Sequence, residues 1–322
     1  MINHILIYVL SFAGVWIGSG IIIKSVERLS RALKISCFTI SFLVLGFFTS
    51  ITEFSVGINS ILTNDPEIYV GNLIGGCIVV FMLIIPLLAI TGSKIRVNAE
   101  LRGFNLPASL TVISLSVVLA MDGRIDRIDA LISLAFFASL IIAIQLKRGI
   151  LEKIKNVNPG LVTRTSREFL RISFGIATIF IASRFIVEQT LHFSQIFNLS
   201  PFLISLLVIG VGTNIPELSF VVRSVFMKSN QIAFGNYVGS ASFNTFLLGI
   251  LTLINGEAVI LTNSYLVSLL FLVVGLLAFY HFARTKNTIS RREGLVLFAF
   301  YLLFLVTEIY IHKEFLLPII SE

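Results

Sequence analysis

Long apolar stretches alternate with short polar segments along the whole chain. The apolar stretches lack the strict alternation of an amphipathic β-strand. They are about 18–28 residues long, and a helix needs ~20 residues to cross a bilayer. In lipid, only helices and closed barrels pair every backbone N–H and C=O group. The pattern therefore predicts ten transmembrane helices, at residues 5–24, 35–62, 68–91, 104–121, 129–146, 171–195, 200–227, 231–254, 263–283 and 294–311.

The basic residues gather in every second polar segment. The first of these basic segments contains Lys24, Arg28, Arg31 and Lys34, whereas the next polar segment, residues 63–67, has no Lys or Arg. The alternation continues along the chain, with residues 122–129 as a mixed segment that holds Arg124 and Arg127 beside three Asp. By the positive-inside rule, it predicts that both termini are extracellular or periplasmic and that residues 147–170 form a basic cytoplasmic linker.

The composition excludes a soluble protein. Of 322 residues, 56% are hydrophobic and only 13% are charged, and the mean hydropathy is +0.98. The net charge of +7 follows from the basic loops and does not indicate nucleic-acid binding. Cys37 and Cys77 are expected to be small buried apolar residues. We predict an integral membrane protein, in the plasma (inner) membrane of a prokaryote.

An internal repeat relates the two halves of the chain. A shift of 164 residues aligns several polar and glycine positions without a gap: Ser36 with Ser200, Gly46 with Gly210, Thr49 with Thr213, Glu53 with Glu217, and Gly71-Asn72 with Gly235-Asn236. Residues 1–146 and 171–322 then form two five-helix repeats. Because five is odd, the second repeat must enter the membrane upside down, and such inverted repeats are typical of secondary transporters.

Glu53 and Glu217 occupy equivalent places within apolar stretches. An ionisable residue there costs about 2.5–3.5 kcal/mol on insertion scales. If the pseudo-symmetry brings the two acids together, they also repel each other. A divalent cation between them would relieve both penalties. The alternative is a pair of separately satisfied acids, each protonated or bonded to the backbone.

The neighbours of the two acids are rich in oxygen. Thr49-Ser50 and Thr213-Asn214 lie one turn before them, and Ser240 and Asn244 lie four residues apart on one helix face. Oxygen ligands suit Ca²⁺, Mg²⁺ or Na⁺. Gly76 and Val80, the repeat equivalents of Ser240 and Asn244, offer no side-chain oxygen. We therefore expect a lopsided cation site made by Glu53, Glu217, Thr49, Thr213, Ser50, Asn214, Ser240 and Asn244.

These motifs resemble those of the calcium/cation antiporter superfamily. Residues 212–217 followed by 235–240 resemble its second alpha-repeat, and residues 46–53 followed by 71–75 resemble the first, most closely in the prokaryotic sodium/calcium exchangers. The resemblance implies ten helices, and first and sixth helices that slide to gate the two sides. It also implies Ca²⁺ bound by the two Glu and the Thr49 and Thr213 carbonyls, with Na⁺ near Ser50, Ser240 and Asn244. Thr52 departs from the family pattern, which has Pro there.

The sequence as a whole indicates a secondary antiporter that exchanges Ca²⁺, or a similar divalent cation, for Na⁺ by alternating access. An exchanger that couples to protons or carries Mg²⁺ on the same scaffold stays open, as does a non-transporting relic. An intramembrane hydrolase is disfavoured because no HExxH motif or nucleophile–base set is present. We expect no enzyme activity and no cofactor. The partners are inorganic cations and the bilayer, and no oligomer is required.

Overall fold

A computed structural model describes most of the chain as helix. Within the part that it describes, the helices group into ten segments in chain order. Six of them are long and apolar enough to cross a membrane on length and composition alone. The described residues are 2–62, 64, 66–92, 94–96, 105–148, 159–196, 214–261, 266–284 and 287–311.

The first half contains five helical segments, two of which include a π-helical turn. Such turns occur within otherwise α-helical segments, frequently at functional sites. The elements are α1 (Ile2–Leu33), α2 (Cys37–Ile40), the π-helical turn η1 (Ser41–Leu45), α3 (Gly46–Thr49), α4 (Ile51–Leu62), α5 (Glu67–Val79), the π-helical turn η2 (Val80–Ile84), α6 (Ile85–Thr91), β1 (Lys94–Arg96), α7 (Asn105–Leu119), β2 (Arg124–Ile125) and α8 (Arg127–Arg148).

The second half repeats this plan. Its elements are α10 (Pro159–Ile196), α13 (Ile215–Met227), α14 (Asn230–Asn255), β3 (Val259–Ile260), α15 (Leu266–Arg284), β4 (Thr288–Ser290) and α16 (Arg291–Ile311). The beginning of the seventh predicted helix, up to residue 213, lies outside the described residues.

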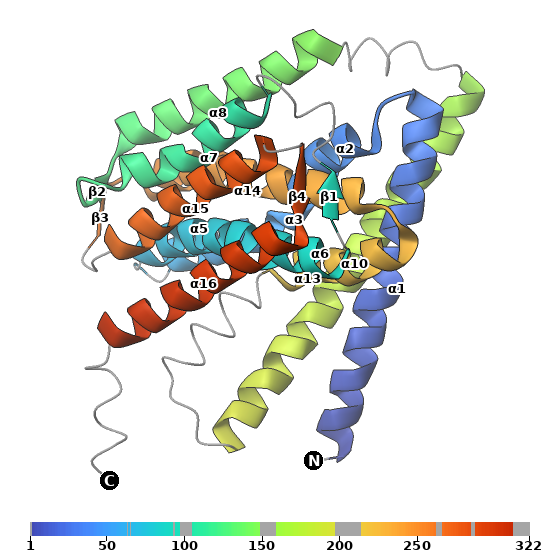
Figure 1. Ribbon diagram of the computed structural model, residues 1–322, viewed down its shortest axis with the longest axis horizontal. Helices are drawn as coiled ribbons and strands as arrows, with labels where there is room; N and C mark the ends of the chain where they lie inside the picture. Colours follow the sequence, from blue (N-terminus) through green and yellow to red (C-terminus); the bar gives the residue numbers. More distant parts are fainter. Residues whose placement is uncertain are drawn as a thin grey trace.

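Two short strand pairs display the symmetry of the halves. Strand β1 pairs with β4, and β2 pairs with β3, both antiparallel. The 164-residue shift carries Ile95 of β1 onto Val259 of β3, and Ile125 of β2 onto Ile289 of β4. Exchanging the halves therefore exchanges the two pairs. Figure 1 shows the pairs at opposite ends of α7 and α15, which is the arrangement of an inverted repeat.

The centre of the bundle is formed by the α5–η2–α6 segment and α14. The side chains of both are largely buried, and α14 contacts α3, α4, α5, α7, α8 and α13. Glycines allow backbones to meet here: a Cβ added to Gly46 would lie 2.7 Å from the carbonyl carbon of Gly239. Small residues at such crossings are typical of membrane helix packing.

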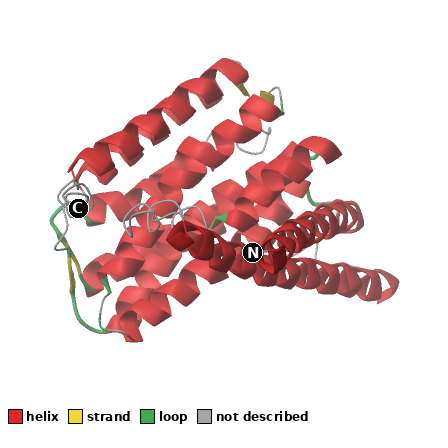
Figure 2. Cartoon of the chain, turned by 90° about the horizontal axis from the view of Figure 1, so that it is seen from below, coloured by secondary structure: helices red, strands yellow, loops and turns green. Residues whose placement is uncertain are grey.

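Helices α1 and α10 form a separate pair beside the bundle. They pack along each other and run in opposite directions, and both project beyond the other helices (Figures 1 and 2). Both are longer than their apolar stretches, since α1 continues to Leu33 and α10 begins at Pro159. Part of the expected linker at residues 147–170 is therefore helical, because α8 reaches Arg148 and α10 begins within that range.

Candidate cation site

Glu53 lies at the start of a helix, directly after a break in the second segment. Helix α3 ends at Thr49, Ser50 has a ψ of 0°, and α4 begins at Ile51. Glu53 is thus the third residue of α4, where the unpaired N–H groups of the first turn favour a negative charge. The residue is only 3% exposed.

Glu217 has the same place in the second half. Asn214 precedes α13 with φ −99° and ψ 12°, Pro216 is the second residue of the helix, and Glu217 is the third. Proline fits there because first-turn N–H groups lack helical partners. Glu217 is fully buried and close enough to Glu53 for their charges to interact. In both halves, a helix therefore begins two residues before a buried acid.

Helix α14 brings a polar face to the same region. Asn236, Ser240 and Asn244 follow one another at intervals of four residues and are all buried. The Thr49 hydroxyl donates to Oδ1 of Asn236 at 3.3 Å, and the Ser50 hydroxyl lies 3.5 Å from the carbonyl oxygen of Ser240. These contacts connect the break before Glu53 to the second half of the molecule.

Helix α5 forms a further wall of this region but contributes few polar side chains to it. A Cβ added to Gly76 would lie 3.4 Å from Nδ2 of Asn244 and 3.8 Å from Nδ2 of Asn214. Asn244 also donates to the carbonyl oxygen of Leu73 at 3.3 Å. Since Gly76 is the repeat equivalent of Ser240, this wall lacks the hydroxyl that α14 has at the matching position.

Several buried oxygens in this region have no donor among the described residues. They are both carboxylate oxygens of Glu217 and Oδ1 of Asn244. Buried polar atoms are nearly always paired, because an unpaired one is costly. A bound cation would satisfy these oxygens, as would a proton on the carboxylate, and oxygen ligands suit Ca²⁺, Mg²⁺ or Na⁺. No cluster of three or more His, Cys, Asp or Glu occurs in the described part of the chain.

The predicted ligand residues that the structure describes are all buried. Thr213 lies outside the described residues, and the ligand roles of the whole set stay a prediction. The described members come together from three elements around the two acids: Thr49, Ser50 and Glu53 from the α3–α4 break, Asn214 and Glu217 from the start of α13, and Ser240 and Asn244 from α14.

Sequence reasoning did not include three residues that contact this set. Asn236 accepts the Thr49 hydroxyl, the Thr52 hydroxyl lies 2.7 Å from Oε2 of Glu53, and the Tyr237 hydroxyl donates to the Glu217 carbonyl oxygen at 3.0 Å. A signal existed for Asn236, because the repeat places an Asn after the first glycine in both halves. Nothing in the sequence singled out Tyr237.

Comparison with known proteins decides the family. The sequence profile described as "Sodium/calcium exchanger protein" matches residues 3–146 and again residues 168–310, once in each half. The chain belongs to this family. It is a cation exchanger family transporter rather than an enzyme, and an integral membrane protein.

Its similarity to individual family members is distant. The chain is 26% identical over 254 residues to the inner membrane protein YrbG of Escherichia coli, covering 74% of this chain and 78% of that protein. It is 29% identical over 147 residues to the sodium/calcium exchanger MaX1 of Methanosarcina acetivorans, which covers 45% of this chain and 42% of that protein.

A solved structure shares the fold. The sodium-calcium exchanger NCX_Mj, in a crystal soaked with zero Na⁺ and Ca²⁺, superposes with a TM-score of 0.78 at 23% sequence identity, covering 95% of this chain and 99% of that one. This likeness shows the fold alone. The ten helices and two halves predicted from the sequence are thereby confirmed for this exchanger-family chain.

Proposed function

We propose that this chain is a secondary antiporter that exchanges Ca²⁺, or a similar divalent cation, for Na⁺ by alternating access. The observation that carries the proposal is the pair of buried acids at equivalent first-turn positions, Glu53 and Glu217. Together they supply the two negative charges that one divalent ion neutralises. Thr49, Ser50, Asn214, Ser240 and Asn244 provide further oxygens around it, and we assign Thr213 to the same set on the strength of the repeat.

The same scaffold could exchange the divalent ion for protons, or carry Mg²⁺. The proton alternative is favoured by the scarcity of side-chain oxygens on the α5–η2 segment. Gly76 of α5 and Val80 of η2 stand where the other half has Ser240 and Asn244. A non-transporting protein is the remaining alternative. Each of these predicts a different response to ion gradients, so one experiment separates them.

The experiment is uptake of radioactive Ca²⁺ into proteoliposomes under separate outward Na⁺, H⁺ and K⁺ gradients. We expect uptake with the Na⁺ gradient and none with K⁺. Uptake driven only by the H⁺ gradient would replace Na⁺ by protons as the counter-ion. If Ca²⁺ uptake is absent under all three gradients but Mg²⁺ is taken up, the transported ion is Mg²⁺. If neither ion moves, the protein is a non-transporting relic.

For the orientation, we propose that both termini are extracellular or periplasmic. Strands β1 and β4 come from two loops that the charge pattern assigns to the cytoplasm, and β2 and β3 come from two loops that it assigns outside. Each strand pair thus joins two loops that the charge pattern assigns to the same side of the membrane. Cysteine accessibility at exposed Glu257, expected outside, and at exposed Arg292, expected inside, tests it in intact cells.

A further inference from the structure

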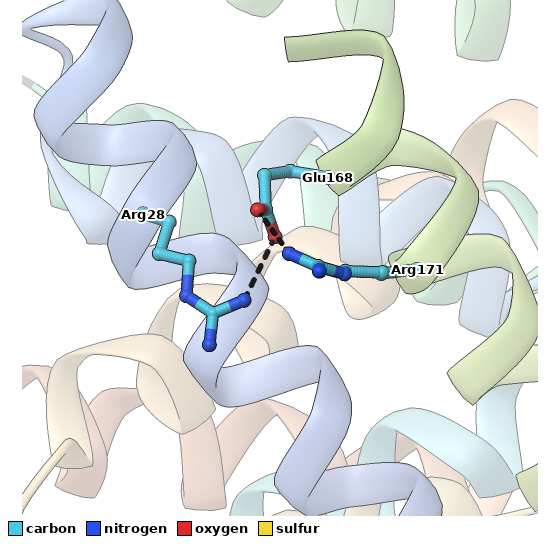
Figure 3. A network of polar contacts seen from close by, with 3 residues as sticks. All are labelled: Arg28, Glu168 and Arg171. Carbon is cyan, nitrogen blue, oxygen red and sulfur yellow. Dashed lines mark hydrogen bonds and ion pairs between the residues drawn. The ribbon is translucent and has the colours of Figure 1, made fainter. Parts of the chain in front are cut away.

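A buried carboxylate and two arginines join α1 to α10, outside the candidate cation site. Glu168 of α10 is 3% exposed. Nη1 of Arg171 donates to its Oε1 at 2.5 Å, and Nη1 of Arg28, on α1, lies 3.5 Å from its Oε2. Figure 3 shows both guanidinium groups converging on the one carboxylate from different helices. The two arginines are thus fixed in direction although their outer parts are accessible.

The arginines line a pocket with more positive charge than Glu168 can neutralise. The pocket has a volume of about 470 Å³ and also contains Lys24 and Arg167. Within the described part of the chain, neither Lys24 nor Arg167 forms an ion pair. The pocket is therefore lined by four cationic side chains, two of which pair with Glu168. A guanidinium has five N–H donors, so Arg28 and Arg171 keep donors for a further acceptor.

One wall of this pocket is apolar and open to the outside. Leu170 is 71% exposed and Phe174 is 64% exposed, and both line the pocket next to Arg171. On a membrane protein, exposed side chains of this kind face acyl chains. The pocket thus combines an anion-binding end with a lipid-facing side, at the charged end of two helices where headgroups lie.

We propose that this pocket binds a phosphate group carried by an anionic membrane lipid. Arg28, Arg171, Lys24 and Arg167 contact the phosphate oxygens, for which arginine forks are well suited, and Leu170 and Phe174 contact the acyl chains. Glu168 positions the two arginines that it pairs. A free phosphate shares the anion chemistry but not the apolar wall. The lipid would bridge α1 and α10, and its binding does not depend on which ions the protein carries.

The test is lipid binding to the purified full-length protein in detergent, measured by native mass spectrometry. The probes are phosphatidylglycerol, zwitterionic phosphatidylcholine and inorganic phosphate. The main variant is Lys24→Gln with Arg167→Gln, because these two residues are outside the Glu168 ion pairs and their replacement leaves those pairs in place. The matched control is Arg291→Gln with Arg292→Gln, which removes the same charge from an exposed helix start.

We expect the native chain to bind phosphatidylglycerol in preference to phosphatidylcholine. The Lys24/Arg167 variant should bind it about fivefold more weakly for each charge removed, and the control should bind as the native chain does. An equal loss in the control would mean general surface attraction and would overturn the proposal. So would displacement of phosphatidylglycerol by inorganic phosphate at similar concentration, which would assign the pocket to a soluble anion.

Discussion

The hydroxyl of Thr52 joins Glu53 to the end of the preceding helix. It lies 2.7 Å from Oε2 of Glu53 and 2.9 Å from the Thr49 carbonyl oxygen. The repeat equivalent of Thr52 is Pro216, which has no polar side-chain atom. The backbone places both acids alike, but the residue directly before the acid offers a hydroxyl to Glu53 and none to Glu217.

Replacing this hydroxyl should weaken divalent binding. Thr52→Val keeps the branched shape and removes the hydrogen bond that orients Glu53, so we expect a several-fold higher Kd, since one such bond contributes about 1 kcal/mol. Thr52→Ser, which keeps the hydroxyl, is the control and should bind nearly as the native chain does. Isothermal titration with Ca²⁺ measures both. Equal Kd values for the Val and Ser variants would mean that the hydroxyl does not position the acid.

The two acids should be individually indispensable. Glu53→Gln and Glu217→Gln each keep the size of the side chain and remove one of the two charges that hold the divalent ion. We expect each to abolish Ca²⁺ uptake in proteoliposomes while the protein still elutes as a folded species. Glu257→Gln, at an exposed loop position, is the control and should transport normally. Near-normal Ca²⁺ uptake by either site variant would contradict the interpretation that the two acids share one cation site.

The positions of these acids could be predicted because a gapless repeat fixes them by register alone. The 164-residue shift aligned Glu53 with Glu217, and both are the third residue of a helix. The contacts of Thr52 could not be predicted. A side-chain hydrogen bond depends on rotamer and on the local course of the broken helix, and neither leaves a periodic trace in the sequence.

The polar end of helix α1 and the short strand pairs were not predicted, for other reasons. Helix α1 continues through Lys24 to Leu33, because charged residues with good helix propensity extend a helix beyond the lipid. A prediction from hydropathy instead ends the helix at the last apolar residue. Strands of two or three residues, such as Arg124–Ile125, are too short for alternation to be recognised. Their pairing depends on loops from both halves meeting in space.

Restoring an oxygen to α5 should strengthen Na⁺ binding. Gly76→Ser introduces the hydroxyl that Ser240 has in the other half, and the Cβ fits, since its nearest neighbour is Nδ2 of Asn244 at 3.4 Å. Gly76→Ala adds the same Cβ without oxygen and is the control. We expect the Ser variant to show a several-fold lower half-saturating Na⁺ concentration in exchange assays than the Ala variant. Identical Na⁺ dependence of the Ser and Ala variants would mean that position 76 does not contribute to Na⁺ binding.

The α1–α10 contact should limit the rate of transport. A Cβ on Gly175 would lie 2.9 Å from the carbonyl oxygen of Gly18, so Gly175→Val forces the two helices apart. If this pair moves during the cycle, as the family resemblance implies, the variant should lower the maximal exchange rate and leave the half-saturating Ca²⁺ concentration unchanged. Ala177→Val, on an exposed position of α10, is the control. A changed Ca²⁺ affinity with normal maximal rate would contradict this role.

The ion ratio follows from charge and ligand supply. Glu53 and Glu217 carry a formal charge of −2, which one divalent ion or two Na⁺ would neutralise. A third Na⁺ would leave excess positive charge in the membrane interior, where Gly76 and Val80 offer no side-chain oxygen and Asn244 adds no negative charge. We therefore expect fewer than three Na⁺ for each divalent ion.

With two Na⁺ for each divalent ion, the cycle moves no net charge, and the membrane potential cannot drive it. A cycle that moved one charge would gain about 2.3 kcal/mol for each 100 mV. The measurement is exchange in vesicles clamped at different potentials with valinomycin and K⁺, with Na⁺ and Ca²⁺ fluxes counted together. We expect the end-point to be the same at every potential. An end-point that shifts with voltage, with three Na⁺ moving for each Ca²⁺, would show that backbone carbonyls or water supply the ligands that Gly76 and Val80 lack.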